Sequence, residues 1–195
     1  MGITMKMIPR LISAFLICFS ISAWSQAAEN SVVVLHTSEG DITIKLYDKK
    51  SPITVANFLK YANSGFYEGT IFHRVIKRFA IQGGGFDKDL QEKPNGESIV
   101  NEAKESGIRN NRWTVAMART DDPNSARSQF FINMRMNLDL DARAGKDGYA
   151  VFGEVTDGQH IARKIANTKT HSYGGFDDLP IEPIFINSVT VTPAK

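Results

Sequence analysis

Histidines are the first candidates for chemistry in this chain, because an imidazole can bind a metal ion or transfer a proton. The chain has four of them: His36, His73, His160 and His171. No two stand three or four residues apart, and none has the helical acidic partner that zinc sites use. The sequence therefore predicts no metal site.

Nucleotide chemistry and acyl transfer are also disfavoured. Three glycines at positions 83–85 follow a strand-like run, but neither Lys-Ser nor Lys-Thr comes after them and no helical pattern begins there. Close packing of the backbone or a bend explains them better. No Gly-x-Ser-x-Gly turn is present to hold a serine nucleophile. We expect no cofactor.

A more specific signal is an ordered set of aromatic and polar segments. They are residues 71–76 (Ile-Phe-His-Arg-Val-Ile), 79–86 (Phe-Ala-Ile-Gln-Gly-Gly-Gly-Phe), 114–119 (Thr-Val-Ala-Met-Ala-Arg), 128–133 (Ser-Gln-Phe-Phe-Ile-Asn) and 148–153 (Gly-Tyr-Ala-Val-Phe-Gly). With these segments the chain resembles the cyclophilins, and the exported bacterial members most closely. The likeness covers residues 31–193 in a single register.

The resemblance implies a fold and an activity. The fold is mainly β: a closed eight-stranded antiparallel barrel with an α-helix at each end and a groove on its outer face. The activity is peptidyl-prolyl cis–trans isomerisation (rotamase), which accelerates rotation about X-Pro bonds in unfolded or extended polypeptides.

The resemblance also implies which residues act. Arg74 matches the catalytic arginine, Gln82 matches the glutamine that orients it and touches the substrate backbone, and Phe79 completes the catalytic set by gripping the proline ring. The resemblance implies three groups of substrate-binding residues. Met117 and Phe131 form walls of the proline pocket, together with Ala80, which stands where the family usually has a methionine. The residue before proline is bound by Ala118, Arg119 and Gln129, and the rim of the pocket is formed by His73, Leu140 and Tyr149. Met117 is expected to lie deeper than the others.

An arginine suits this reaction. At the twisted transition state the proline nitrogen regains its lone pair, so a permanently protonated guanidinium near it favours that state over both planar isomers. Taken alone, Arg74 would be a solvated charge, Phe79 and Phe131 core aromatics, and Gln82 an ordinary strand residue. Their joint order is what favours the catalytic interpretation.

Three departures from the family pattern affect the expected groove. Residues 77–78 are Lys-Arg where the family commonly has Pro-Gly, and Ala80 replaces the methionine, which predicts a roomier proline pocket. Asp139 stands where cyclosporin-sensitive members carry tryptophan. A carboxylate lacks the apolar face and the N–H of an indole, so we expect weak cyclosporin binding.

The elements that must position these residues are short strands and two helices. Alternation over 42–47, after a run at Val32–Thr37, predicts a hairpin. Further strand-like runs are expected at residues 70–75, 79–82, 113–118, 129–133, 149–155 and 184–191.

One helix should begin at Ser51-Pro52, with the serine as its cap and Val55, Phe58, Leu59 and Ala62 on one face, and end by Gly65. A second is expected over residues 159–167. The long polar connections at residues 86–110, 120–128, 134–148 and 168–181 are expected to build a binding surface.

The first 27 residues have the layout of a cleaved signal peptide. Lys6 and Arg10 precede an apolar run of about 14 residues, shorter than the roughly 20 of a spanning helix, and small residues follow at 25–27. A permanent anchor is the disfavoured alternative, as is a lipid on Cys18, since Ile17 before it is bulky. We therefore expect residues 28–195 to form one exported domain, in the periplasm if the source is Gram-negative.

Composition limits the partners. The full chain carries a net charge of +2, which falls to zero when Lys6 and Arg10 leave with the signal peptide, and Cys18, the single cysteine, leaves with them. A neutral, cysteine-free domain is expected to bind neither nucleic acid nor membrane and to have no disulfide. We also expect a monomer. Two alternatives stay open: a peptide-binding chaperone or adaptor module with little catalysis, and a solute-binding or structural barrel of convergent sequence.

Overall fold

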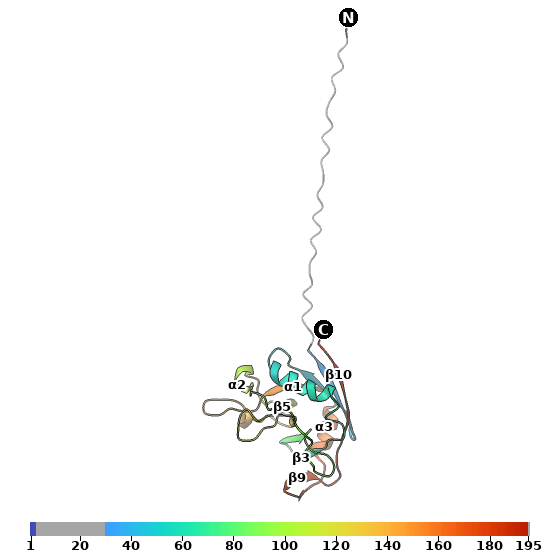
Figure 1. Ribbon diagram of the computed structural model, residues 1–195, viewed down its shortest axis with the longest axis vertical. Helices are drawn as coiled ribbons and strands as arrows, with labels where there is room; N and C mark the ends of the chain where they lie inside the picture. The colour runs from blue at the N-terminus through green and yellow to red at the C-terminus, as the bar shows by residue number, and fades with distance from the viewer. Residues whose placement is uncertain (3–29, 195) are drawn as a thin grey trace.

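The computed structural model describes residues 1–2 and 30–194 (Figure 1). The signal peptide expected at 1–27 lies outside the described residues except for its first two, so it stays a prediction. Among the described residues no helix is both long and apolar enough to cross a membrane.

Eight strands form one antiparallel sheet in the order β10-β1-β2-β7-β5-β6-β4-β3. Their bounds are β1 Val32–Thr37, β2 Gly40–Leu46, β3 Phe72–Ile76, β4 Ala80–Gly83, β5 Thr114–Met117, β6 Phe130–Asn133, β7 Val151–Asp157 and β10 Ile186–Thr192. Each of the eight strand-like runs in the sequence therefore contains a strand, displaced by at most a few residues.

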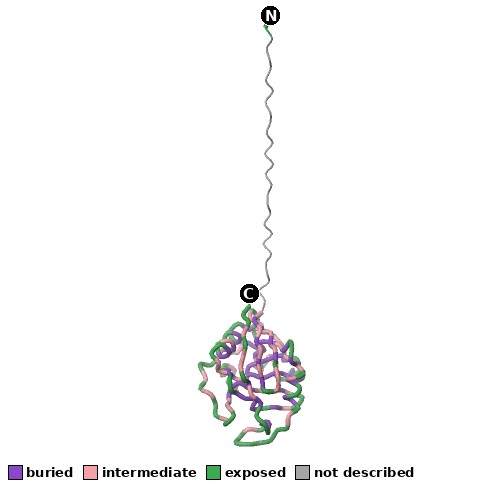
Figure 2. The backbone as a smooth tube through the Cα atoms, turned by 90° about the vertical axis from the view of Figure 1, so that its right-hand side faces the viewer, coloured by how far each residue is buried: buried purple, intermediate pink, exposed green. Residues whose placement is uncertain are grey.

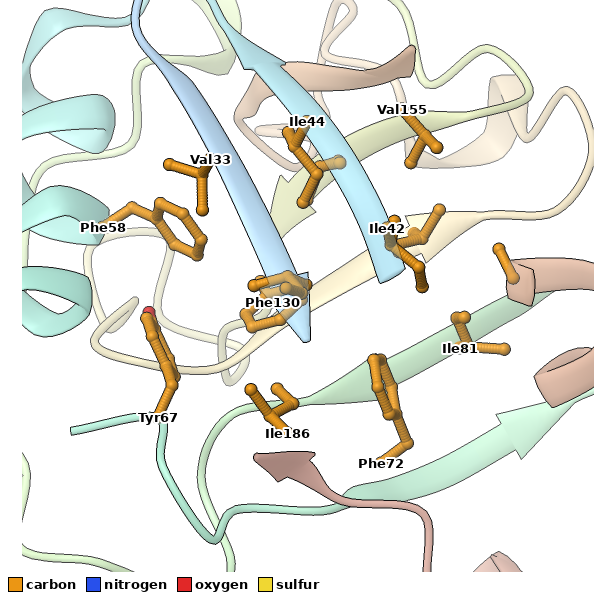
Figure 3. Close-up of a cluster of buried hydrophobic side chains, with 14 of the residues drawn as sticks. Val33, Ile42, Ile44, Phe58, Tyr67, Phe72, Ile81, Phe130, Val155 and Ile186 are labelled. Carbon is orange, nitrogen blue, oxygen red and sulfur yellow. The ribbon is translucent and has the colours of Figure 1, made fainter. Parts of the chain in front are cut away.

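The alternating apolar residues of the first hairpin face the core, as predicted for a half-buried strand. Val33 and Leu35 of β1 and Ile42 and Ile44 of β2 are fully buried, while the residues between them face outward. Figure 3 shows part of the core they form, and Figure 2 shows the buried residues gathered inside the domain.

The sheet curls until its two end strands meet along a short seam. An isolated bridge pairs Ile71 with Phe185, and Phe72 N donates to Ile184 O at 2.9 Å. Ile186 N donates to Thr70 O at 2.8 Å. The barrel is thus joined by a few backbone bonds just before β3 and β10, not by a full ladder between them.

Two helices pack against this barrel, as predicted. Helix α1 (Pro52–Asn63) adds Val55, Phe58 and Ala62 to the core, and the Phe58 ring meets Phe130 edge-on at 5.5 Å. Helix α3 (Gln159–Ala166) adds Ala162, Ile165 and Ala166.

The predicted cap of α1 is wrong. The Ser51 hydroxyl donates to the carbonyl of Val151 at 2.7 Å and makes no capping bond. The cap is Glu102, a buried residue far along the chain, whose carboxylate accepts from Ile53 N at 3.0 Å and Thr54 N at 2.7 Å. A carboxylate suits this place because it satisfies free amides and the positive end of the helix dipole.

Four short elements lie inside the segments expected to be connections: α2 (Ala103–Ser106), the 3₁₀ turn η1 (Leu138–Leu140), β8 (Thr170–Tyr173) and β9 (Phe176–Pro180). Strands β8 and β9 form a separate two-stranded sheet whose β9 strand lies against β3.

Candidate active site

A β-bulge turns Arg74 toward the outer face of the barrel. Phe72 pairs with Gly83 but Arg74 pairs with Gln82, so one extra residue, His73, stands between them on β3. Phe72 and Val75 consequently both point into the core, and Arg74 between them is exposed. Without the bulge, strict alternation would place Arg74 on the same face as Phe72.

Beside Arg74 lies a pocket of about 240 Å³. It is lined by Arg74, Ile76, Phe79, Ala80, Gln82, Ala118, Arg119, Phe131, Leu140 and Tyr149. The structure therefore brings together most of the predicted site residues, which come from several strands and loops. Ile76 was not predicted; its outward place two residues after Arg74 on β3 is the signal that could have found it.

The floor of the pocket is a small apolar cluster separate from the barrel core. Ala80, Ala116, Phe131 and Val151 are buried there, with Phe79 packed against them. Ala80 lines the pocket with a short side chain, and the roomier proline pocket expected from it stays a prediction. A pocket of this kind can hold one small apolar ring.

One wall of the pocket is held rigid by Arg119. Its guanidinium lies 4.5 Å from the Tyr149 ring centroid, and its Nε donates to Gly148 O at 3.0 Å. Tyr149 in turn meets Phe131 edge-on at 5.6 Å. These contacts fix the ring positions before any ligand arrives.

Gln82 is held by Gln129. The Gln82 amide donates to Gln129 Oε1 at 2.9 Å, and within the described part of the chain no hydrogen bond joins Gln82 to Arg74. The three glycines at 83–85 allow this approach. A Cβ on Gly85 would lie 2.5 Å from Gln129 Cγ, and Gly84 has φ +82°, so close packing is their role, as expected.

Ala118, Arg119 and Gln82 also line a second hollow of about 290 Å³, which extends the pocket into a groove. Gln129 lies here, with Glu92, Asn95, Thr120, Ser125, Arg127 and Ser128. The predicted place for the residue before proline therefore lies next to the predicted place for the proline ring.

Two predicted residues, Met117 and His73, line neither the pocket nor the second hollow. Met117 lies in the barrel core at 1% exposure, deeper than the pocket wall as expected. His73 is buried beneath Phe86 at 4.7 Å and Phe176 at 6.1 Å, so it supports β3 and does not form a rim. Burial first, and then the Arg74 charge, lower the pKa of His73 to about 4, so its ring is neutral near pH 7.

The opposite end of the pocket is held by three buried asparagines. Asn137 donates to Phe79 O at 3.0 Å and to Asn133 Oδ1 at 2.7 Å, and Asn133 donates to Asn110 Oδ1 at 3.1 Å. Asn110 donates to Leu140 O at 3.1 Å. This chain of amides ties the Phe79 wall to the Leu140 wall.

Among the described residues no group of three or more His, Cys, Asp or Glu is placed to hold a metal ion. The groups that the pocket does offer are a guanidinium, a glutamine amide and aromatic walls. This set can orient a peptide and donate hydrogen bonds to it.

Comparison with known proteins identifies relatives along nearly the whole domain. The sequence profile described as "Cyclophilin type peptidyl-prolyl cis-trans isomerase/CLD" matches residues 32–191. Peptidyl-prolyl cis-trans isomerase A of Dickeya dadantii is 44% identical over 185 residues, covering 93% of this chain and 97% of that protein. Peptidyl-prolyl cis-trans isomerase B of Escherichia coli is 48% identical over 165 residues, covering 83% and 99%.

A solved structure agrees with the fold. The crystal structure of a cyclophilin type peptidyl-prolyl cis-trans isomerase from Cryptosporidium parvum superposes with a TM-score of 0.72 at 28% identity, covering 84% of this chain and 98% of that one. A second structure of that protein, in the presence of the dipeptide Ala-Pro, gives 0.71 at 28% identity, covering 83% and 98%.

Proposed function

The chain belongs to the cyclophilin-type family of peptidyl-prolyl cis–trans isomerases, and on that premise we propose that Arg74, Gln82 and Phe79 carry out isomerisation on exported polypeptides. The chain is an isomerase whose substrates are X-Pro bonds. The finer points proposed are which residues act, where the enzyme works and which ligands it takes.

The reaction breaks no bond. It rotates an amide over a barrier of roughly 18–20 kcal/mol, and unassisted it takes tens to hundreds of seconds. At the top of the barrier the proline nitrogen becomes a hydrogen-bond acceptor. A charge-assisted bond from the Arg74 guanidinium, at about 1.5–3 kcal/mol, accelerates rotation by roughly tenfold to a hundredfold.

The rest of the rate acceleration comes from positioning of the substrate. The proline ring enters the apolar pocket between Phe79 and Phe131, with Ala80 beneath it, while the carbonyl of the preceding residue swings past Arg74. Ala118, Arg119 and Gln129 bind the residue before proline. Gln82, held by Gln129, offers its free Oε1 to Arg74 or to the substrate backbone.

The observation that carries this proposal is the exposed guanidinium of Arg74 on the rim of an apolar pocket of about 240 Å³. That a C. parvum relative was solved in the presence of the dipeptide Ala-Pro supports an X-Pro ligand for this chain.

The test is isomer exchange in a short proline peptide, measured by NMR with the purified protein and with Arg74→Ala. We expect strong acceleration that a folded Arg74→Ala variant loses. Saturable peptide binding without acceleration by the folded wild type would favour the alternative, a binding module that acts as a chaperone or adaptor.

We further propose that the enzyme is exported to the periplasm, that it acts as a monomer without stable membrane association, and that cyclosporin binds it weakly. The signal-like pattern at 1–27 supports export. Cell fractionation with an antibody against the domain tests it, and accumulation of the full-length chain in the cytoplasm would contradict it.

A further inference from the structure

Strand β6 gives the groove a direction. At one end Ala118 N donates to Gln129 O at 2.9 Å, just before β6. In the middle Gln82, itself paired with Arg74, stands opposite Phe131. At the other end Met134 N donates to Phe79 O at 2.9 Å. Ala118 and Phe79 thus mark opposite ends, because their partners Gln129 and Met134 are separated along this strand by about 16 Å at 3.3 Å per residue.

The Phe79 end carries three exposed cations. Lys77 and Arg78 form the turn that leads from β3 into Phe79. Arg135 follows Met134, and its guanidinium lies 5.9 Å from the Phe79 ring centroid. Within residues 30–194, no salt bridge involves any of these three side chains.

Arg135 is held in place before a ligand arrives. Its Nε donates to Asn137 Oδ1 at 2.8 Å, and Asn137 is itself fixed by Asn133 and the Phe79 carbonyl. Among residues 30–194 no group bonds the two terminal nitrogens of the guanidinium, which form a fork. Such a preorganised fork matches a carboxylate.

The carboxylates near this end are already engaged. Asp139 pairs with Arg143 at 3.5 Å, and Lys146 Nζ donates to its backbone carbonyl. Asp141 accepts from Asn110 N at 2.7 Å. Five cations, namely Lys77, Arg78, Arg135, Arg143 and Lys146, outnumber these two carboxylates, so the Phe79 end is positively charged although the predicted mature domain as a whole is neutral.

Because the two ends of the groove differ, these cations lie beside the part of a substrate that follows the proline. Under the proposed function, the residue before proline lies at the Ala118 end, so the chain that follows proline leaves across the Phe79 end. We propose that Arg135, with Lys77 and Arg78, selects X-Pro segments that carry Asp or Glu within two or three residues after the proline. This inference rests on the proposed function and names its preferred substrate class.

The experiment measures isomer exchange in three peptides that differ only at the second residue after proline, which is Glu, Gln or Lys. We expect kcat/KM for the Glu peptide to exceed that for the Lys peptide by about fivefold at low salt, since exposed ion pairs are individually weak. The ratio should approach one at about 1 M salt, where the Debye length is about 3 Å.

Two variants locate the effect. Arg135→Gln should bring the Glu-to-Lys ratio close to one, and Lys77→Gln with Arg78→Gln should reduce it partly. Lys169→Gln is the matched control, because Lys169 precedes β8 and lines neither hollow of the groove; it should leave the ratio as in wild type.

The outcomes separate the two proposals. Equal acceleration of all three peptides by wild type overturns the charge preference but leaves the isomerase proposal intact. A preference that survives all three substitutions also overturns it, because its source would lie elsewhere. No acceleration of any peptide overturns the proposed function itself, and the substrate preference with it.

Discussion

The Gln82 side chain donates a 2.9 Å hydrogen bond to Gln129 Oε1, from one strand edge of the groove to its neighbour. This bond uses the amide nitrogen of Gln82 and leaves its oxygen free as an acceptor. Gln129 therefore orients the residue that is expected to orient Arg74.

Loss of this bond should slow catalysis without unfolding the barrel. We expect Gln129→Ala to lower kcat/KM by up to about tenfold, the value of one ordinary hydrogen bond, and Arg74→Ala to lower it further. Peptide exchange rates measured by NMR compare the two. Gln91→Ala, in an exposed loop, is the control. A Gln129→Ala enzyme with wild-type rates would show that Gln82 needs no support.

Arg78 should be a removable source of strain. It has φ +62° in the turn before Phe79, a conformation that costs a residue with a Cβ roughly 1–2 kcal/mol relative to glycine. We expect Arg78→Gly to raise the free energy of unfolding by about 1 kcal/mol in urea titrations. Arg78→Ala keeps the Cβ and should give no such gain. An equal gain from both variants would point to the charge as the cause.

Glu102 should contribute to stability through helix α1. Its carboxylate accepts two backbone amides and the Thr54 hydroxyl, the last at 2.6 Å. Glu102→Ala should lower the free energy of unfolding by about 1–2 kcal/mol, the usual cost of a lost cap. Glu105→Ala, exposed in α2, should change little in the same denaturant series. Equal effects of the two substitutions would refute the capping role.

His73 should make the fold sensitive to mild acid. Its pKa is about 4 in the folded protein, because burial disfavours the charged ring, and about 6.5 when unfolded. The unfolded chain therefore binds more protons between these values. The stabilisation is complete above pH 6.5 and is lost as pH falls toward 4, by roughly 3 kcal/mol in all.

Denaturant titrations between pH 7.5 and 4 test this dependence. His73→Phe should flatten it, and His160→Gln, on the exposed face of α3, should not. A wild-type stability that stays constant down to pH 4.5 would contradict the shift.

Cyclosporin should bind weakly, and Asp139→Trp should strengthen binding. The Asp139 side chain is 89% exposed and pairs with Arg143, so it presents charge where an apolar face would be needed. Isothermal titration calorimetry compares the two proteins. A tight complex with the wild type would disprove the prediction.

Strands and helices were predictable because the pattern of apolar residues that indicates each one lies within its own short segment. Alternating apolar residues over 42–47 predict a strand with one face against the core, and the apolar spacing over 55–62 predicts a helix with one face against the core. Strand β2 and helix α1 are found at these places. The ordered motifs placed Arg74, Phe79 and Phe131 around one pocket for a different reason: they follow a family pattern.

Contacts between distant parts of the chain could not be read in this way. Serine before proline is a good local cap, yet Glu102 takes that role from 49 residues away. The bulge at His73 arises from the way β3 pairs with β4, which the sequence of β3 alone does not reveal. His73 is buried because Phe86 and Phe176 of β9 pack over its ring. The β8–β9 hairpin was missed because β8 is exposed throughout and shows no alternation.

The pairing of β1 with β10 has a consequence for the order in which this chain is made. Val32 pairs with Thr192, and Ala194 N donates to Ser31 Oγ at 3.1 Å, so the first strand to be synthesised lies beside the last. Until β10 has left the ribosome, or any channel through which the chain is threaded, β1 lacks one neighbour and the seam with β3 stays open. The barrel therefore cannot close while the chain is growing through β1 to β9, and its closure waits for the synthesis of β10.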